Sequence, residues 1–194
     1  MSDELAWETL DREVAYTCPG FDVVHEDVRL PDGTETDYDY VDEPPAVVVL
    51  PFRDGDDENG TEVLVIEEWR QAVDRVNRGL PAGTVEPEDE DLAAAARREL
   101  AEETGHAAET VEHLLTVEPA NGIADSVHHY FVARGCRPDA GQRLDRDESI
   151  RVGTAAYADL RDDVLAGAVR DGRTALAVLR YECGRAGSEA ERTE

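Results

Sequence analysis

The sequence predicts an α+β fold: a mixed β-sheet flanked by helices and preceded by an N-terminal β-segment. Apolar or alternating stretches bounded by Pro, Gly and Asp recur along the chain, which is typical of strands. Only three stretches show the 3.6-residue spacing of a helix. The chain has 194 residues, of which 41% are hydrophobic, so it is long and apolar enough to bury one core.

Strand-like stretches begin in the N-terminal β-segment Trp7–Val41. Two of them alternate between apolar and polar residues around a Pro-Asp-Gly turn, and the next is a continuous apolar run that fits a buried strand. The polar stretch Asp54–Gly60 is predicted to be a turn. The predicted strands are Phe21–Leu30, Thr34–Val41, Ala46–Phe52, Glu62–Trp69, Val111–Val117, Val127–Ala133 and Ile150–Tyr157.

Helical spacing is found in three places, Pro87–Thr104, Asp159–Gly167 and Arg173–Cys183. The first of these is expected to begin at Pro87 or Asp89. It contains four consecutive alanines, which are strong helix formers, and Gly105 suits the left-handed residue that follows a helix.

The chain is expected to consist of three segments. Residues 1–41 form the N-terminal β-segment, residues 42–185 the main domain, and residues 186–194 a flexible tail. Within the main domain, Gly135–Ser149 is predicted to be a long polar loop, and loops of that length in a compact domain are often functional.

The composition is strongly acidic. There are 46 Asp and Glu against 19 basic residues, for a net charge of −27, and every basic residue is Arg. We interpret this as adaptation to a salt-rich cytoplasm, where ions screen the self-repulsion of the surface. A specific basic partner is the alternative. Non-specific nucleic-acid binding is excluded as a function, because it depends on cations that neutralise phosphates.

The sequence also predicts a cytoplasmic location without membrane contact. It contains no apolar run near 18 residues and no basic stretch at its start, which argues against a membrane span and a secretory signal. Cys18, Cys136 and Cys183 are odd in number and widely spaced, so we expect scattered reduced thiols rather than a disulfide framework or a metal knuckle.

Carboxylates gather in the second half of the first predicted helix. Glu99, Glu102 and Glu103 lie on one side of it, next to an apolar stripe that draws part of this acidic face toward the protein body. Crowded carboxylates favour a hard divalent cation such as Mg²⁺ or Mn²⁺. Arg98, one turn before Glu102, can orient the cluster. A simple solvated charged face is the alternative, and the flanking pattern decides between the two.

That flanking pattern resembles the Nudix box, Gly-x5-Glu-x7-Arg-Glu-apolar-x-Glu-Glu-x-Gly-apolar. Its fixed positions are occupied by Gly83, Glu90, Arg98, Glu99, Leu100, Glu102, Glu103 and Gly105. Six residues rather than five separate Gly83 from Glu90, so Glu90 or Glu88 is expected in the supporting acidic position. His106 stands at the closing apolar position.

The resemblance implies an α/β/α Nudix sandwich and a hydrolase that cleaves a nucleoside diphosphate linked to another moiety. It implies that Glu99, Glu102 and Glu103 bind metal, together with a backbone carbonyl at Ala82 or Gly83. The expected ion is Mg²⁺, with Mn²⁺ as a possible substitute, and two or three ions are expected once a diphosphate is bound.

The segments around the box resemble those of ADP-ribose pyrophosphatases. They are Val65–Arg70, Leu80–Gly83, the loop Pro119–Asp125 and Gly167–Ala177. The resemblance implies cleavage of ADP-ribose, or a related nucleoside diphosphate sugar, to AMP and a sugar phosphate. Arg70 and Gly122 are the expected substrate contacts.

Two catalytic bases are compatible with the resemblance. Glu148, in the loop before the last strand, is the first choice, and Glu99 in the box is the alternative. The subfamily also implies a homodimer in which the N-terminal segment packs against the partner subunit. The rival functions are hydrolysis of another nucleoside diphosphate derivative, and a sensing domain that binds a nucleotide without cleaving it.

Overall fold

The fold was analysed in a computed structural model that describes residues 4–53, 61–146 and 148–191. The predicted turn Asp54–Gly60 therefore lies outside the described residues. Contacts divide the chain into two units. One contains the N-terminal residues up to Pro45 together with Val117–His128, and the other contains Ala46–Thr116 and the chain from His129 onward.

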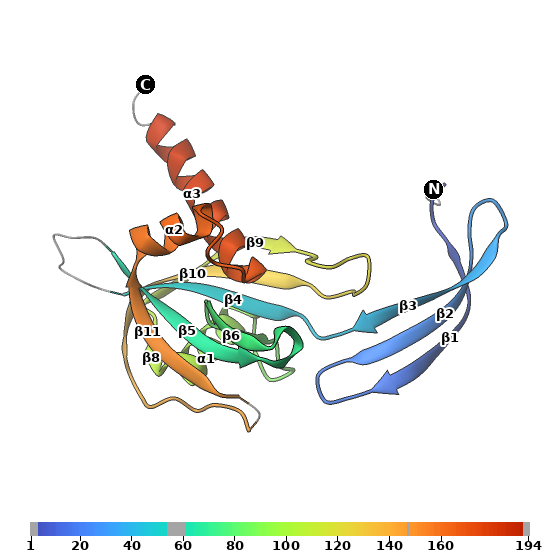
Figure 1. Ribbon diagram of the computed structural model, residues 1–194, viewed down its shortest axis with the longest axis horizontal. Coiled ribbons are helices and arrows are strands. Elements are labelled where there is room, and N and C mark those ends of the chain that lie inside the picture. The colour runs from blue at the N-terminus through green and yellow to red at the C-terminus, as the bar shows by residue number, and fades with distance from the viewer. Residues whose placement is uncertain (1–3, 54–60, 147, 192–194) are drawn as a thin grey trace. The chain divides into compact units, whose positions relative to one another are not determined.

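Figure 1 labels the elements along the chain. The strands are β1 (Glu8–Thr17), β2 (Asp22–Arg29), β3 (Glu35–Asp42), β4 (Ala46–Arg53), β5 (Glu62–Arg70), β6 (Arg75–Gly79), β7 (Ala82–Thr84), β8 (His106–Ala107), β9 (Thr110–Val117), β10 (His128–Pro138) and β11 (Ile150–Ala156). The helices are the 3₁₀-helix η1 (Gln71–Val73), α1 (Leu92–Thr104), α2 (Tyr157–Leu165) and α3 (Gly172–Glu191).

The first unit is a three-stranded antiparallel sheet in the order β1-β2-β3. Its strand β1 is additional to the two alternating stretches predicted from the sequence. Val24 and Val28 of β2 are buried. The segment 117–128 joins this unit through two backbone hydrogen bonds, from the Val41 amide to the Ile123 carbonyl and from the Asp125 amide to the Val41 carbonyl.

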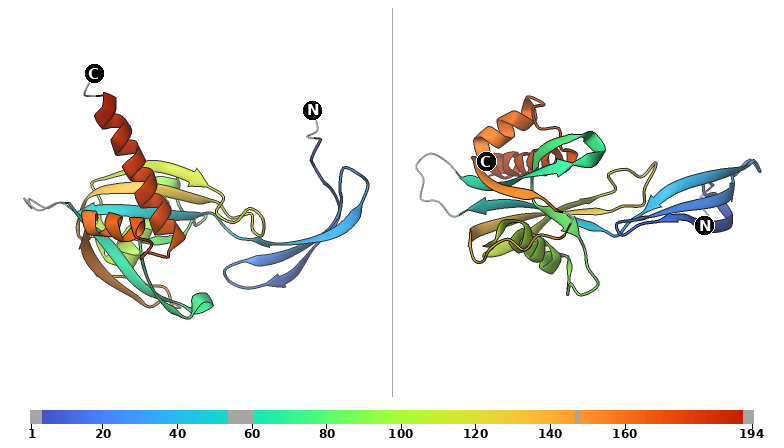
Figure 2. Two further views of the ribbon diagram at one scale, coloured as in Figure 1. Left: turned by 45° about the horizontal axis from the view of Figure 1, so that its top comes forward. Right: turned by 60° about the horizontal axis from the view of Figure 1, so that its bottom comes forward.

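The second unit contains an eight-stranded sheet with the central order β11-β5-β4-β10-β8. Strand β6 pairs with β5, β7 with β4, and β9 with β10. Figure 2 shows α1 on one face of this sheet and α2 and α3 on the other. The predicted class, a mixed sheet flanked by helices, is confirmed.

The core under α1 explains how the helix is held in place. Ala95, Ala96 and Leu100 have no exposed surface, and the two alanines allow the helix to approach the sheet closely. Burial of a side chain of leucine size contributes about 1.5–3 kcal/mol. The buried members of this core are Val47, Val49, Leu64, Ala95, Ala96, Leu100, Phe131, Ala133 and Cys136.

Several element boundaries differ from the prediction. Helix α1 begins at Leu92 rather than at Pro87 or Asp89, because Asp91 caps it: the Asp91 carboxylate accepts a hydrogen bond from the Ala94 amide at 2.8 Å. The short strands β6 and β7 were not predicted, since neither is long enough to show a period.

Two further boundaries were also wrong. Strand β10 continues to Pro138, which leaves a shorter loop of residues 139–149 before β11. Helix α3 continues to Glu191, beyond the predicted helix end at Cys183. Alanine and glutamate in that stretch favour helix. None of the helices in the described parts of the chain is long and apolar enough to cross a membrane.

Candidate active site

The site is built where strand β7 passes the middle of helix α1. Glu99 and Glu103 point from α1 toward this strand and are buried, with 8% and 2% of their surface exposed. The Glu103 carboxylate accepts a hydrogen bond from the Ala82 amide at 2.8 Å. A side chain at Gly83 would lie only 2.2–2.3 Å from the Glu99 carboxylate. The backbone therefore lies close to both carboxylates, and a side chain at position 83 would force the Glu99 carboxylate to move from its place beside Arg98.

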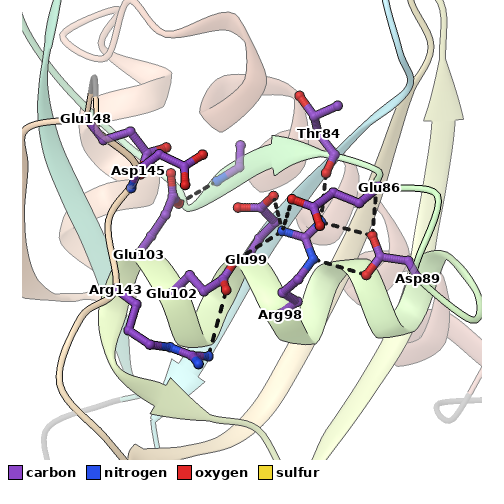
Figure 3. Close-up of polar contacts among 11 residues, drawn as sticks. Thr84, Glu86, Asp89, Arg98, Glu99, Glu102, Glu103, Arg143, Asp145 and Glu148 are labelled. Atoms are coloured by element: carbon purple, nitrogen blue, oxygen red, sulfur yellow. Dashed lines mark hydrogen bonds and ion pairs between the residues drawn. The ribbon is translucent and has the colours of Figure 1, made fainter.

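Arg98 is the main cation of the site (Figure 3). Its guanidinium donates hydrogen bonds to Glu99 at 2.8 Å and to Glu102 at 3.1 Å, which agrees with the orienting role predicted for it. It also donates to the Thr84 carbonyl at 2.8 Å. Because only about a fifth of its side chain is exposed, these contacts form a network that solvent screens weakly.

The supporting acid is Asp89, and not Glu90 or Glu88 as predicted. Both oxygens of Asp89 accept hydrogen bonds from Arg98, at 3.1 and 2.9 Å. This pairing lowers the pKa of Asp89. Glu88 and Glu90 are exposed. Asp89 follows Gly83 after five residues, as in the box, and this spacing was the signal that could have identified it.

The buried carboxylates carry more negative charge than their surroundings compensate. Burial raises the pKa of Glu99 to about 7, although Arg98 opposes the shift. Burial raises the pKa of Glu103 to about 8, and the negative charges of Glu99 and Glu148 add to it. Such a cluster favours the binding of cations.

The donor set fits a hard divalent cation, because it consists of carboxylate oxygens beside a backbone strand with no side chain in the way. Among the described side chains, however, no three acidic, histidine or cysteine groups surround a common point. The contacts explain this: Arg98 holds Glu99 and Glu102, while the Ala82 amide holds Glu103. Glu99 and Glu103 thus lie buried beside β7 without forming a ready-made ligand set in the described residues, and the coordination of metal by the predicted residues stays a prediction.

Glu148, the first choice for the base, lies beside this cluster (Figure 3). Its carboxylate accepts a hydrogen bond from the Asp145 amide at 3.0 Å. Its charge raises the pKa of both Glu99 and Glu103. The loop that carries it also places Arg143 3.7 Å from Glu102. The structure therefore gathers both candidate bases in one place.

Comparison with known proteins identifies the family. The model of the NUDIX domain matches residues 42–180, which is most of the chain. The chain belongs to the Nudix family. It is a Nudix hydrolase, and hydrolases of this family generally use a divalent metal ion and act on nucleoside diphosphate derivatives.

Relatives of this Nudix hydrolase include two bacterial proteins. The ADP-ribose pyrophosphatase of Bacillus subtilis is 29% identical over 172 residues, which cover 88% of this chain and 90% of the relative. The methanol dehydrogenase activator of Bacillus methanolicus is 29% identical over 154 residues, covering 79% and 80%. A crystal structure of an ADP compounds hydrolase has the same fold, with a TM-score of 0.80, 23% identity, and coverage of 96% and 98%.

The two residues predicted to contact the substrate, Arg70 and Gly122, lie in different units of the structure. Arg70 lies at the end of β5 and pairs with Glu68 at 2.7 Å. Burial raises the pKa of Glu68, and Arg173 and Glu148 act on it electrostatically. Arg70 is thus linked to the buried acidic cluster through Glu68. Sequence reasoning missed Glu68 because no motif marks it.

Gly122, the other predicted contact, belongs to the first unit. Its carbonyl accepts a hydrogen bond from the Tyr38 hydroxyl at 2.8 Å, so it helps to fasten the 117–128 segment to β3. The structure does not bring Gly122 together with the box residues within one unit. Its role toward a substrate stays a prediction.

Proposed function

We propose that this Nudix hydrolase is a Mg²⁺-dependent pyrophosphohydrolase that cleaves ADP-ribose, or a related nucleoside diphosphate sugar, to AMP and a sugar phosphate. The observation that carries the proposal is the buried cluster of Glu99 and Glu103 with Glu148 beside it. The likeness to the Bacillus subtilis ADP-ribose pyrophosphatase, which extends over nine-tenths of that protein, supports the choice of substrate.

Each residue of the cluster has a role in this proposal. Glu99, Glu102 and Glu103, with a carbonyl of Ala82 or Gly83, would hold the ions. When bound, divalent ions polarise phosphoryl oxygens and lower the pKa of a bound water.

Glu148 is the proposed base. The alternative base, Glu99, is itself one of the proposed metal ligands, and its carboxylate is also held by Arg98 at 2.8 Å. Glu148 is instead held by a neutral backbone amide, that of Asp145. Arg98 keeps the box carboxylates oriented. Arg70 is the proposed contact to the substrate phosphates, because its guanidinium can bind phosphate oxygens in a bidentate manner.

We expect the purified protein, in molar KCl with Mg²⁺, to release AMP and ribose 5-phosphate from ADP-ribose. Products are to be separated by ion-exchange chromatography, with Mn²⁺ as a second metal and EDTA as the control. Activity only on nucleoside triphosphates or on sugar nucleotides of another base would contradict the substrate proposal and leave the family unchanged. Tight binding of ADP-ribose without turnover under both metals would favour a sensing domain.

We further propose that the protein is a homodimer in which the N-terminal sheet contacts the partner subunit. Every residue of β1 is exposed in the single chain. Its apolar side chains include Trp7 just before the strand, Leu10, Val14 and Tyr16, each 40–58% exposed. Apolar side chains gathered along one edge strand indicate an interaction surface. Exposure of apolar side chains to water is unfavourable, and the unpaired backbone groups of an edge strand can pair with another chain.

Val14→Arg is expected to abolish the dimer. Light scattering in molar KCl should give a mass near twice 21.3 kDa for the wild type and near 21.3 kDa for the variant. Glu13→Arg is the matched control, since successive side chains of a strand point to opposite faces. A monomeric wild type, or a Val14→Arg variant that still dimerises, would contradict the proposal.

A further inference from the structure

The C-terminal end of α1 is capped by the loop that carries Glu148. The last carbonyls of a helix lack partners within it and need other donors. Here the Gly105 carbonyl accepts hydrogen bonds from the Asp139 and Ala140 amides, at 3.0 and 3.3 Å. The Glu102 carbonyl accepts one from the Arg143 amide at 2.9 Å. The helix that presents the box carboxylates and the start of the loop are therefore joined through backbone contacts.

Gln142 completes this junction with its side chain. Its amide nitrogen lies 2.6 Å from the Glu103 carbonyl and 3.5 Å from the Ile150 carbonyl, where the chain enters β11. One side chain thus reaches both the residue before the end of α1 and the far end of the Glu148 loop. Glutamine suits this place because its amide group offers two N–H donors.

The fit between loop and helix is tight. Gly105 has a φ of 71°, and a side chain there would lie 2.5 Å from the Ala140 carbonyl oxygen. The neighbouring Gly141, in contrast, has open space where a side chain would be. The first part of the loop therefore has little freedom at Ala140. In the part of the loop that follows Gln142, the Glu148 amide donates a hydrogen bond to the Asp145 carbonyl, and the Glu148 carboxylate accepts one from the Asp145 amide.

We propose that Gln142 is a positioning residue, which fixes the Glu148 loop to helix α1 and so sets the distance between the base and the carboxylates of Glu99 and Glu103. The catalytic part of this inference rests on the proposed function. A displacement of about 1 Å at a reacting group can cost on the order of 100-fold in rate. Loss of the Gln142 contact is therefore expected to lower kcat more than KM, because substrate binding does not pass through it.

The test compares Gln142→Ala and Gln142→Glu with the control Gly141→Ala. Gln142→Glu keeps the size of the side chain and removes its N–H donors, so both Gln142 variants should lower kcat for ADP-ribose by about 10- to 100-fold with little change in KM. Gly141→Ala should retain wild-type kcat. Wild-type kcat in Gln142→Ala, or an equal loss in Gly141→Ala, would overturn the proposal.

A second measurement tests, independently of enzyme activity, whether Gln142 fixes the Glu148 loop to α1. Hydrogen exchange by NMR should accelerate at the Asp145 and Glu148 amides in Gln142→Ala, while the melting temperature and exchange in the interior of α1 stay unchanged. Unchanged exchange at those two amides would overturn the proposal, and so would exchange that accelerates throughout the protein.

Glu148→Gln separates this inference from the proposed function. If Glu148 is the base, adding Gln142→Ala to Glu148→Gln should cause little further loss of kcat, because the two changes act through one group. A full additional loss would overturn the positioning role. If Glu148→Gln keeps wild-type activity, the assignment of the base fails, and with it the catalytic part of this inference. The anchoring part is then decided by hydrogen exchange.

Discussion

Glu103→Gln is expected to lower turnover by about 100-fold or more and to leave the metal-free protein as stable as the wild type or more stable. The change removes one negative charge from the proposed metal site, and perturbation of metal sites typically costs 10- to 100-fold even at supporting residues. It also relieves repulsion from Glu99 and Glu148. Glutamine retains a side-chain carbonyl oxygen that can accept the hydrogen bond from the Ala82 amide.

The gain in stability should depend on pH in a defined direction. The pKa of Glu103 is raised from 4.5 to about 8 in the folded protein, so the folded state binds a proton that the unfolded state has lost between these values. Wild-type stability therefore falls as pH rises from about 4.5 to about 8, relative to a variant with a neutral side chain. The advantage of Glu103→Gln should grow across this range, to on the order of 5 kcal/mol at about 1.4 kcal/mol per pKa unit, and stay constant above it.

Urea unfolding in EDTA between pH 5 and 9 measures this advantage. Glu112→Gln is the control, because this exposed carboxylate of β9 changes the net charge equally without lying in the cluster. Excess Mg²⁺ should reduce or reverse the advantage, since an ion that binds only the folded wild type stabilises it. Destabilisation by Glu103→Gln at every pH would contradict the prediction and assign Glu103 a structural role at the Ala82 amide.

The sequence was sufficient for the part of the site that lies on one helix. The spacing of Glu99, Glu102 and Glu103 determines their common side once the segment is helical, and the structure shows these residues with Arg98 among them. The supporting acid was harder to identify. All four residues from Glu88 to Asp91 are acidic, and only the fold of the turn before α1 shows that Asp89 is the one that pairs with Arg98.

The rest of the site depends on contacts between distant segments, which local patterns do not encode. Glu68 lies near Arg173 because β5 and the start of α3 meet in space, more than 100 residues apart in the chain. Gln142 contacts the Glu103 carbonyl across 39 residues. The strands β6 and β7 were missed for the same reason, since their pairing with β5 and β4, and not their own short sequences, makes them strands.

Arg98→Ala is expected to be the most destabilising of these substitutions. It removes the partner of Asp89, whose side chain is only 7% exposed, and of the buried Glu99. Breaking a buried ion pair by removing one partner typically costs about 3–5 kcal/mol, because the remaining charge stays in a poorly solvated place. Activity should also fall, since Glu99 and Glu102 lose the group that orients them. Urea unfolding in EDTA and initial rates on ADP-ribose measure the two effects.

Arg97→Ala is the matched control, because Arg97 is the adjacent arginine on the same helix but is exposed. Its described side-chain contact is a hydrogen bond to the Ala108 carbonyl at 2.8 Å, so its loss should cost about 1 kcal/mol or less. Arg98→Lys should fall between the two, since a lysine ammonium cannot reproduce the planar fork that binds Asp89 through both oxygens. Mg²⁺ should restore part of the stability of Arg98→Ala, because bound ions replace the missing positive charge at Glu99 and Glu102 but not at Asp89. Equal stability losses in Arg97→Ala and Arg98→Ala would contradict this account, because the network around Arg98 would then contribute no more than a single exposed hydrogen bond.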